Sequence, residues 1–490
     1  MATRQYIGAR YVPLIDGDYD ASKTYEPLTV VLGDDGNSYT SKTFVPAGTS
    51  LSDTTYWALT GNYNAQVESY RAETANVKND VDDLYKMGTY VTPQMYGAIG
   101  DGVTDDTAAF QEALNTGNNV FVPTSNNEQY YIGSELYITT SRQCLFSVEN
   151  GRGGEEISPT ALTRNAIIFN HELTNGVIIS TNGVIIANLT FTNDNRSATH
   201  YVTAIKAAAV NNIDTDLSVK NCKFFTMKTA VENTGRGLLF EDNLVIACDN
   251  GVLTDFPTPT GTGFSSPEYG NRALTVRNNR FHAIATLSVK IGGNYINSAE
   301  IIGNVLDVGR GFLQVDGSIS SMTIANNVIH YCRQNNSINI NGDVTGLIIN
   351  GNQFKGTTDA EINISTYGFI RFNGDAANVI ISNNMFNCCE RSAITVEGSK
   401  SLSNASITGN TFTAIGTDLN SIRADIILST SATMENSVII GNSAYSDDAT
   451  YFINALTAYT AASLWVYANS IPSKTVANRI TAGTGSTIQS

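Results

Sequence analysis

The sequence is poor in charged residues, cysteine and histidine. Of its 490 residues only 15% are Asp, Glu, Lys or Arg, and there are six Cys and four His. The cysteines show no CxxC spacing, so they are interpreted as small buried hydrophobes and not as a disulfide framework or a zinc site. They stand at Cys144, Cys222, Cys248, Cys332, Cys388 and Cys389. No metal or other cofactor is predicted.

Long apolar runs are also missing, and the charge has one dominant sign. No run reaches the roughly 18 residues of a membrane span. The start, "MATRQYIGARYVPL", has no apolar core or cleavage pattern, so no signal peptide is expected. The formal net charge of −16 disfavours nucleic acid and anionic membranes as partners. A neutral glycan is the better match, whereas an anionic glycan would need a local basic patch or bridging cations.

What the sequence does contain is a repeat. From about residue 240 the pattern apolar-x-x-Asn-x-apolar recurs, as in "FEDNLV", "IIGNVL" and "ISNNMF", with spacings of 23 to 36 residues. Two weaker copies, "VKNCKF" and "IANLTF", have the Asn one place earlier. The repeated residues are Asn243, Asn279, Asn304, Asn327, Asn352, Asn384, Asn410, Asn442 and Asn469.

The residues within each copy predict strands. Ile, Val and Phe alternate with polar residues, and the NN, GN and AN steps are able to turn in the left-handed conformation. A repeat near 25 residues that tolerates insertions is typical of a solenoid, and stacked Asn side chains hydrogen-bond along such an axis. The prediction is a parallel β-helix. Leucine-rich repeats are the rival, but their LxxLxL signature is absent.

A second column supports this fold and defines a polar strip. Glycines at one expected corner stack as Gly293, Gly317, Gly342, Gly374 and Gly398. The outward positions just before them are Gly292, Asp316, Asn341, Asn373 and Glu397, and a second outward column is Lys290, Gln314, Asn339, Arg371 and Thr395. One face of the solenoid therefore presents amides, acids and two bases.

The stretch "MYGAIGDGVTDDTAAFQEAL", residues 95–114, is glycine- and aspartate-rich and then becomes helical in pattern. Thr104, Asp105 or Asp106 can cap a helix over about 104–116, and Gly117 can end it. Its apolar stripe is Ala109, Phe110, Ala113 and Leu114. An amphipathic helix here would cover the open end of the β-helix. The alternative, a metal or phosphate loop, lacks the lysine of a P-loop and dinucleotide-binding spacing.

This stretch, followed by "NNVFVPTSNNEQYYIGSELYI", resembles the start of the pectate-lyase-like superfamily. The resemblance covers about residues 91–140 and implies an all-β, right-handed single-stranded parallel β-helix, which the repeats extend to about residue 471. It does not fix an activity, because the superfamily contains lyases, hydrolases, epimerases and non-catalytic proteins. Members with an added N-terminal module are often phage tailspikes, which are usually homotrimers.

Residues 1–62 are predicted to form a small β module. They resemble type-3 chitin-binding-like modules through Tyr19, Tyr25, Val30, Tyr39, Pro46 and Trp57. That resemblance implies that Tyr25, Tyr39 and Trp57 stack on a sugar, with Asn341 and Asn373 as further carbohydrate-binding candidates on the β-helix. The alternatives are that Tyr39 and Trp57 form a small core and that the module is a virion-attachment head.

Residues 63–88 predict a helical neck. Apolar and β-branched residues with 3-4 spacing form a heptad seam at Val67, Tyr70, Thr74, Val77, Val81 and Leu84. This seam is too short to be stable alone, so it is expected to pack beside other chains or the β-helix. β-branched residues at both seam positions favour more than two strands, and the preferred interpretation is a trimeric neck, with a lone linker helix as the alternative. The β-helix is expected over 89–471, and 472–490 as a polar tail.

Glycoside hydrolysis requires two nearby carboxyl groups. Asp316 and Glu397 are expected three coils, roughly 14 Å, apart and cannot be a pair. Asp343 and Asp375 follow stacked glycines in adjacent coils and could lie about 5 Å apart, with Arg371 to hold an acidic group. The candidate catalytic set is therefore Asp316, Asp343, Arg371, Asp375 and Glu397. The alternative is that these acids are solubilising or interface residues.

The preferred hypothesis is a phage tailspike that binds a host surface polysaccharide and is either a hydrolase or a lyase. It would be a virion protein whose N-terminal region contacts other tail or baseplate proteins. The second hypothesis is a non-enzymatic adhesin or structural tail component of the same architecture. A secreted polysaccharide lyase or hydrolase is the third. Sequence motifs of polygalacturonases are absent around His171, His200, His282 and His330.

Overall fold

In the computed structural model the chain divides into two compact units, residues 1–88 and 89–490. The structure describes residues 13–86, 90–123, 129–148, 166–195, 201–208, 214–256, 273–293, 296–332, 336–356, 368–389, 391–415, 424–445, 449–472 and 474–489. Within these ranges no helix is both long and apolar enough to cross a membrane. The two units are described separately.

The first unit contains a four-stranded sheet and a helix. Its elements are β1 Leu14–Asp18, β2 Thr29–Leu32, β3 Ser38–Ser41, β4 Trp57–Gly61 and α1 Tyr63–Lys86. The small core holds Tyr25, Val31, Val45 and Trp57, all buried. Helix α1 is exposed at every described side chain from Val67 to Lys78. The expected helix is present, and the seam residues Val67, Tyr70, Thr74 and Val77 are exposed.

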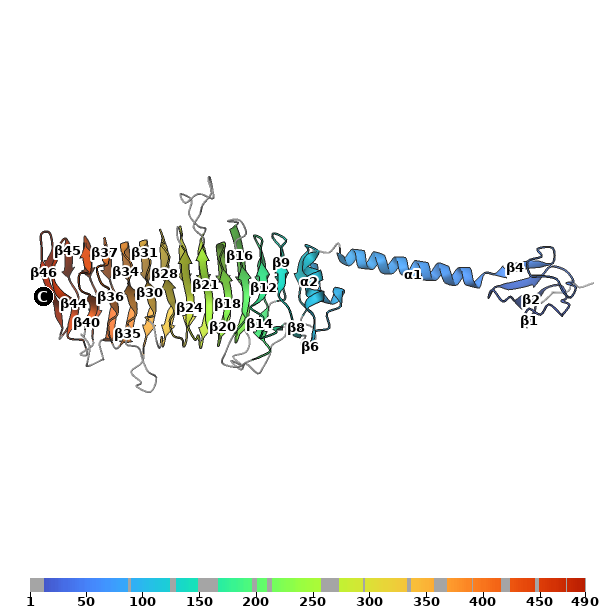
Figure 1. Cartoon of the computed structure of the whole chain (residues 1–490), viewed down its shortest axis with the longest axis horizontal. Helices are drawn as coiled ribbons and strands as arrows, with labels where there is room; N and C mark the ends of the chain where they lie inside the picture. Colours follow the sequence, from blue (N-terminus) through green and yellow to red (C-terminus); the bar gives the residue numbers. More distant parts are fainter. Residues whose placement is uncertain are drawn as a thin grey trace, which may run out of the picture. The chain divides into compact units, whose positions relative to one another are not determined.

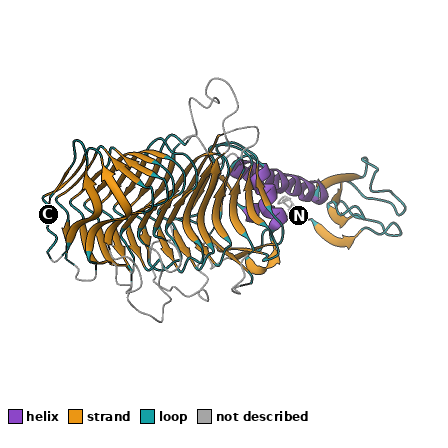
Figure 2. Cartoon of the chain, turned by 60° about the vertical axis from the view of Figure 1, so that its left-hand side comes forward, coloured by secondary structure: helices purple, strands orange, loops and turns teal. Residues whose placement is uncertain are grey.

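The second unit is the predicted β-helix, built from three parallel sheets that the chain visits in turn (Figures 1 and 2). Sheet I contains β5 Tyr90–Val91, β7 Asn119–Phe121, β10 Cys144–Phe146, β13 Ile185–Ala187, β16 Asp214–Lys220, β19 Arg236–Glu241, β22 Leu274–Arg277, β25 Ala299–Ile302, β28 Met322–Ala325, β31 Val344–Asn350, β34 Ala376–Ser382, β37 Ser401–Ser403, β38 Ser406–Thr408, β41 Thr433–Glu435, β42 Ser437–Ile440, β45 Leu464–Tyr467 and β47 Thr487–Ile488.

The other two sheets have 13 strands each. Sheet II contains β6 Asp101–Asp105, β8 Gln129–Ile132, β11 Ala166–Phe169, β14 Thr190–Asn193, β17 Lys223–Phe225, β20 Leu244–Ile246, β23 Arg280–His282, β26 Val305–Leu306, β29 Val328–His330, β32 Gln353–Lys355, β35 Met385–Cys389, β39 Thr411–Ile415 and β43 Ser443–Ala444. Sheet III contains β9 Leu136–Ile138, β12 Asn175–Ile179, β15 Thr203–Ala207, β18 Thr229–Asn233, β21 Asn250–Phe256, β24 Leu287–Gly293, β27 Leu313–Val315, β30 Ile338–Ile340, β33 Ile370–Phe372, β36 Ile394–Val396, β40 Ala424–Leu428, β44 Tyr451–Ala461 and β46 Thr475–Ala482.

The repeated asparagines form the ladder that the sequence predicts, at the turn from sheet I to sheet II. Asn327 is typical: its Oδ1 accepts bonds from the backbone N and the Nδ2 of Asn304, and its own Nδ2 donates to Ile301 O and to Asn352 Oδ1. All four distances are between 2.8 and 3.0 Å. The residue before each ladder position is left-handed, such as Asn326 at φ 56° or Gly303 at φ 68°. In the two weaker copies Asn188 and Asn221 occupy this left-handed position.

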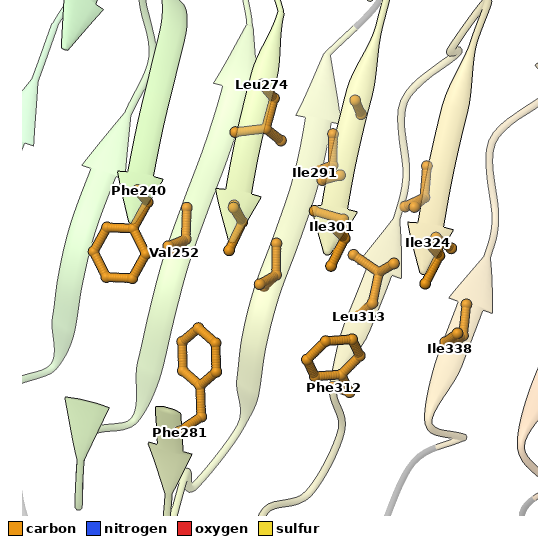
Figure 3. Close-up of a cluster of buried hydrophobic side chains, with 14 of the residues drawn as sticks. Phe240, Val252, Leu274, Phe281, Ile291, Ile301, Phe312, Leu313, Ile324 and Ile338 are labelled. Atoms are coloured by element: carbon orange, nitrogen blue, oxygen red, sulfur yellow. The ribbon is translucent and has the colours of Figure 1, made fainter. Parts of the chain in front are cut away.

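Inside the solenoid, alternating apolar side chains of successive coils lie against one another (Figure 3). Phe191, Phe224 and Phe169 stack with ring centroids 5.3–6.0 Å apart, and Phe354, Phe386 and Phe412 form a second stack at 4.9–5.0 Å. Cys222 and Cys248 belong to this interior and Cys332 packs against it, and burial raises the pKa of each thiol to about 12. Such thiols are inert, in agreement with their interpretation as small hydrophobes.

Helix α2, Thr107–Asn115, covers the end of the β-helix as predicted. Its stripe of Ala109, Phe110, Ala113 and Leu114 is buried, and Gly117 ends it at φ 76°. Asp105 Oδ1 accepts the Thr107 N–H at 3.0 Å, while the Asp106 carboxylate accepts the N–H groups of Ile99 and Gly100. The aspartates of the Gly-Asp cluster thus bind backbone N–H groups of the turn that precedes the helix and of its first residue. A short 3₁₀ helix, Pro93–Tyr96, precedes it.

The C-terminal boundary differs from the expectation. The segment from 472 onward was expected to be a tail outside the repeats, but β46 pairs with β44 and β47 pairs with β45. The β-helix therefore continues for another coil, to Ile488. The Asn repeat did not predict this coil, because the coil has no Asn at the ladder position.

Candidate functional site

The candidate strip lies where sheet III ends and turns into sheet I. The register of sheet III aligns one outward column through thirteen strands. We name this column the sheet III ladder. It consists of Tyr137, Ile178, Lys206, Glu232, Leu253, Lys290, Gln314, Asn339, Arg371, Thr395, Ile427, Asn454 and Asn478. The five positions expected from the sequence occur in it in the predicted order.

The glycine corner beside the ladder is held by close backbone contact. A Cβ added to Gly317 would lie 1.9 Å from Gly293 O, and one added to Gly342 or Gly374 would lie 2.1 Å from the preceding glycine's carbonyl oxygen. No side chain larger than hydrogen fits at these three positions, so successive coils stay in register at this corner. Gly398 differs, since nothing lies within 4 Å of its added Cβ.

Asp316 is held by a polar cluster on neighbouring coils. It accepts a 2.7 Å bond from Asn341 Nδ2 and 2.9 Å bonds from Gln314 Nε2, and Lys290 Nζ lies 3.2 Å away. Asn373 Nδ2 in turn donates to Asn341 Oδ1 at 2.8 Å. Burial raises the pKa of Asp316, but these hydrogen bonds and the lysine charge outweigh it and hold the pKa below its ordinary value. Asp316 is therefore an anion at neutral pH.

Asp343 and Asp375 lie in adjacent coils, as the sequence indicates, but their carboxylates bind backbone. Asp375 N donates to Asp343 Oδ1 at 3.0 Å, and Ser401 N donates to Asp375 Oδ1 at 2.8 Å. Lys400 Nζ lies 3.7 Å from Asp375. The bond from the Ser401 backbone holds the pKa of Asp375 below its ordinary range. The pair therefore fixes the turn in successive coils, and the low pKa makes Asp375 a poor proton donor.

Arg371 and Glu397 form the second charged pair of the strip. Arg371 Nε lies 3.1 Å from Glu397 Oε1, and Ser429 Oγ donates to Glu397 Oε2 at 3.0 Å. The structure thus gathers all five candidate residues on one edge but divides them into three sets: Asp316 with its amides, Asp343 with Asp375, and Arg371 with Glu397. Ser401, Lys400 and Ser429 complete these sets and carry no motif that would single them out in the sequence.

The aromatic candidates of the first unit lie elsewhere. Trp57 and Tyr25 are each only 2% exposed, and their ring centroids are 5.3 Å apart. This burial corrects the expectation that both rings stack on a sugar, since each is enclosed by the other and by Tyr19. Tyr39 is partly exposed and donates from its hydroxyl to Asp35 at 2.7 Å. In so small a module, filling the core takes the aromatic side chains that would otherwise be available for a ligand.

Histidine and metal chemistry are not concentrated at the strip. His171 Nδ1 lies 2.7 Å from Asp194 and His282 Nδ1 lies 3.0 Å from Asp307, and none of these four residues belongs to the sheet III ladder. Across the described ranges, no group of three or more His, Cys, Asp or Glu side chains could hold a metal ion. The strip offers hydrogen-bond donors, acceptors and three ion-paired cations, Lys290, Arg371 and Lys400.

No protein-family model matches the chain. It is 54% identical over 41 residues to a capsule K30/K69-specific depolymerase of Klebsiella phage K64-1, and 33% identical over 101 residues to depolymerase 1, also capsule K30/K69-specific, of Klebsiella phage K5-2. These matches cover 8% and 20% of this chain, and only 5% and 11% of the two relatives. They are thus local.

Among solved structures, the chain resembles DFA-IIIase from Arthrobacter chlorophenolicus A6, with a TM-score of 0.51 and 12% identity over 82% of this chain and all of that one. Tailspike protein 3 of bacteriophage CBA120 aligns over 97% of this chain and 78% of its own, with a TM-score of 0.44 and 11% identity. At such identities the first likeness supports the β-helical fold alone.

Proposed function

We propose that this chain is the receptor-binding spike of a bacteriophage tail and that it binds a bacterial surface polysaccharide along the sheet III ladder. The observation that carries the proposal is the ladder itself. Over four successive coils it carries Lys290, Gln314, Asn339 and Arg371 in strict register. Asn339 is buried, whereas the three longer side chains are partly exposed. Parallel strands repeat about every 4.8 Å, so such a column offers a periodic row of donors to a periodic polymer. The local matches to two phage capsule depolymerases support the polysaccharide class.

The charge balance favours a neutral or weakly acidic polymer. Each base near the strip is paired with an acid: Lys290 with Asp316, Arg371 with Glu397, and Lys400 with Asp375. This pairing leaves the strip without a net positive charge, so a strongly anionic chain gains little electrostatic attraction there. Hydroxyl groups of a sugar, in contrast, can bond to the amides and to the outer oxygens of the carboxylates without breaking the pairs.

Binding is tested with two matched lysine variants. A panel of purified capsular polysaccharides, Klebsiella types K30 and K69 included, is immobilised and the chain is applied in solution. Lys290→Met on the ladder is expected to weaken binding by about tenfold, since an ion-paired donor is lost. Lys355→Met on sheet II removes an equal charge from a different face. Loss in both variants, or in neither, would contradict the ladder as the binding surface.

Cleavage is the second candidate function, favoured because both curated relatives are depolymerases. The strip's geometry supports it less, because Asp316 and Asp375 have lowered pKa values and so make poor general acids. New reducing ends without absorbance from unsaturated uronates would indicate a hydrolase, and both signals together a lyase. Asp343→Asn and Asp375→Asn should abolish either signal if this pair is catalytic. Binding without any cleavage favours the adhesin.

We further propose that the chain is a homotrimer. The seam residues Val67, Tyr70 and Val77 of α1 are 38–67% exposed, which is unfavourable for an isolated helix in water. Sheet I adds a second apolar surface at outward positions of its last coils, including Ile348, Ile380 and Trp465, each about 40% exposed or more. A trimer would cover the apolar side chains of both surfaces with those of neighbouring copies.

A further inference from the structure

A hollow on the outer face of sheet I belongs to neither the strip nor the neck. It has a volume of about 650 Å³ and spans the strands β16, β19 and β22. Its walls include Asp216, Ser218, Leu239, Thr275 and Arg277, and the residues just before β25, Asn297 and Ser298, complete it. This volume falls in the range of about 300–1,000 Å³ that is typical of ligand pockets.

A β-bulge creates the hollow. Asp214 pairs with Arg236 and the next pair is Leu217 with Leu238. Thr215 and Asp216 on β16 therefore stand opposite Gly237 alone on β19, which is a bulge. Asp216 takes a left-handed conformation at φ 39° and Gly237 lies opposite at φ 85°. A Cβ on Gly237 would lie 2.5 Å from Asp216 Oδ1 and 3.2 Å from its Cα, so only glycine fits. Bulges of this kind re-aim side chains and are common beside binding sites.

The bulge is fixed from the inside. Thr215 is buried, and its hydroxyl donates to a group of three acceptors: Asn233 Oδ1 at 3.0 Å, Arg236 O at 3.1 Å and Gly237 O at 3.2 Å. Asn233 is buried as well and its Nδ2 donates to Gly237 O at 3.2 Å. A non-glycine left-handed residue costs free energy, and here two buried side chains hold it in place. The shape of the hollow is therefore preorganised.

The electrostatics of the hollow suit an uncharged ligand. Arg277 Nε lies 2.6 Å from Glu241 Oε1, and Lys220 Nζ lies 3.7 Å from the other oxygen of that carboxylate. Asp216 adds a carboxylate on the opposite wall. With acids beside the arginine, a phosphate or polyanion gains little here. Hydroxyls of Ser218, Thr275 and Ser298, with Leu239 as an apolar wall, match the alternating hydroxyl and C–H surface of a sugar.

We infer that this hollow is a second glycan-binding site, on a different face from the sheet III ladder, and that it holds a short neutral segment of the polysaccharide. The inference rests on the proposed function, since it assumes a chain that recognises polysaccharide. Two sites on two faces would let one spike hold two segments of the same polymer or of neighbouring polymers. The effective concentration of the second segment would then raise the overall affinity without further contacts.

The test fills the hollow and leaves the ladder intact. Thr275→Phe places a ring in the hollow, and Thr323→Phe is its matched control, because the two threonines occupy the same outward column of sheet I two coils apart. Binding to the capsular polysaccharide panel is measured for both, after circular dichroism and thermal unfolding have shown that each variant folds. Thr275→Phe is expected to weaken binding by about tenfold and Thr323→Phe by less than about twofold.

A second, isosteric variant tests whether Thr275→Phe weakens binding only by disturbing the surrounding structure. Thr275→Val keeps the shape and removes the hydroxyl, so a loss of about threefold supports a direct hydrogen bond to the sugar. Unchanged binding by Thr275→Phe, with loss in Lys290→Met, overturns the second site and leaves the proposed function standing. Loss in Thr275→Phe with Lys290→Met unaffected supports the hollow and contradicts the ladder. Absence of all binding by the wild-type chain overturns both.

Discussion

Asp425 and Lys474 form an ion pair inside the solenoid: Lys474 Nζ lies 2.7 Å from Asp425 Oδ2, and neither side chain is exposed. Asp425 belongs to β40 and Lys474 precedes β46, so the pair joins two non-adjacent coils near the C-terminal end. Asp425 Oδ1 has no hydrogen-bond partner among the described residues. A buried pair with an unsatisfied oxygen contributes little net stability, yet it is costly to break on one side.

Removing one partner of this pair is therefore expected to destabilise the folded chain strongly. Lys474→Met should lower the free energy of unfolding by about 3–5 kcal/mol, because it leaves a buried carboxylate without its cation. The double variant Asp425→Val, Lys474→Met should be close to the wild type. Urea denaturation measures both. Lys400→Met, which removes one partner of a largely exposed pair, is the control and should change stability by less than about 1 kcal/mol. A double variant as unstable as the single one would contradict this account.

The same pair predicts a pH dependence. Burial raises the pKa of Asp425 to about 6 from an ordinary value of 3.8, against the attraction of Lys474. A carboxyl group whose pKa is raised on folding contributes its full stabilisation of the folded state when the pH is below its pKa in the unfolded chain. That stabilisation is lost as the pH rises through its pKa in the folded state. Between about pH 4 and 6 the wild type should lose roughly 3 kcal/mol relative to Asp425→Asn, which does not titrate. Parallel curves for the two proteins across that window would refute the raised pKa.

The asparagine ladder predicts opposite outcomes at two adjacent positions. Asn327→Ala removes four side-chain hydrogen bonds and leaves the buried Asn304 N–H without its acceptor. The free energy of unfolding is therefore expected to fall by about 2–4 kcal/mol. Asn326→Gly should be neutral or stabilising, because the left-handed position before the ladder is already glycine at Gly303 and Gly351. Thermal unfolding at a fixed scan rate compares the two. Similar losses at both positions would show that the ladder is not the source of stability at this turn.

The neck predicts an assembly that charge can break. Tyr70→Glu with Val77→Glu places two acids in the heptad seam and should reduce the molar mass in light scattering from that of a trimer to that of a monomer. Ala72→Glu adds one acid to the opposite side of α1 and should leave the mass unchanged. A wild-type chain that is monomeric at micromolar concentration would remove the basis for the trimer.

The repeat could be predicted from the sequence because its positions are dictated by local rules. Asn at the ladder, glycine at the tight corner and alternating apolar residues each have one physical cause and recur over several successive coils. Asp425 and Lys474 escape such rules: one appears as an ordinary polar residue in "RADIILS" and the other lies in a segment without the Asn signal. Their pairing depends on two coils that only the fold brings together.

The site was partly predictable for the same reason. Register along sheet III follows from the repeat, so the columns with Asp316 and Arg371 could be aligned from the sequence. Which carboxylates bind backbone could not, because Asp343 and Asp375 look identical to free surface acids until the Ser401 N–H is placed. The hollow on sheet I depends on the register shift between β16 and β19 beside Asp216, which the other described strand pairs of sheet I lack, so no repeating signal announces it.

The central claim is that the polysaccharide lies on sheet III, and hydroxyl-radical footprinting of the complex tests it most directly. Leu253 and Ile427 are partly exposed members of the sheet III ladder, and Met385 is 50% exposed on sheet II. The account predicts that bound capsular polysaccharide reduces labelling of Leu253 and Ile427 and leaves Met385 unchanged. Protection of Met385 with no protection of the ladder residues would contradict it.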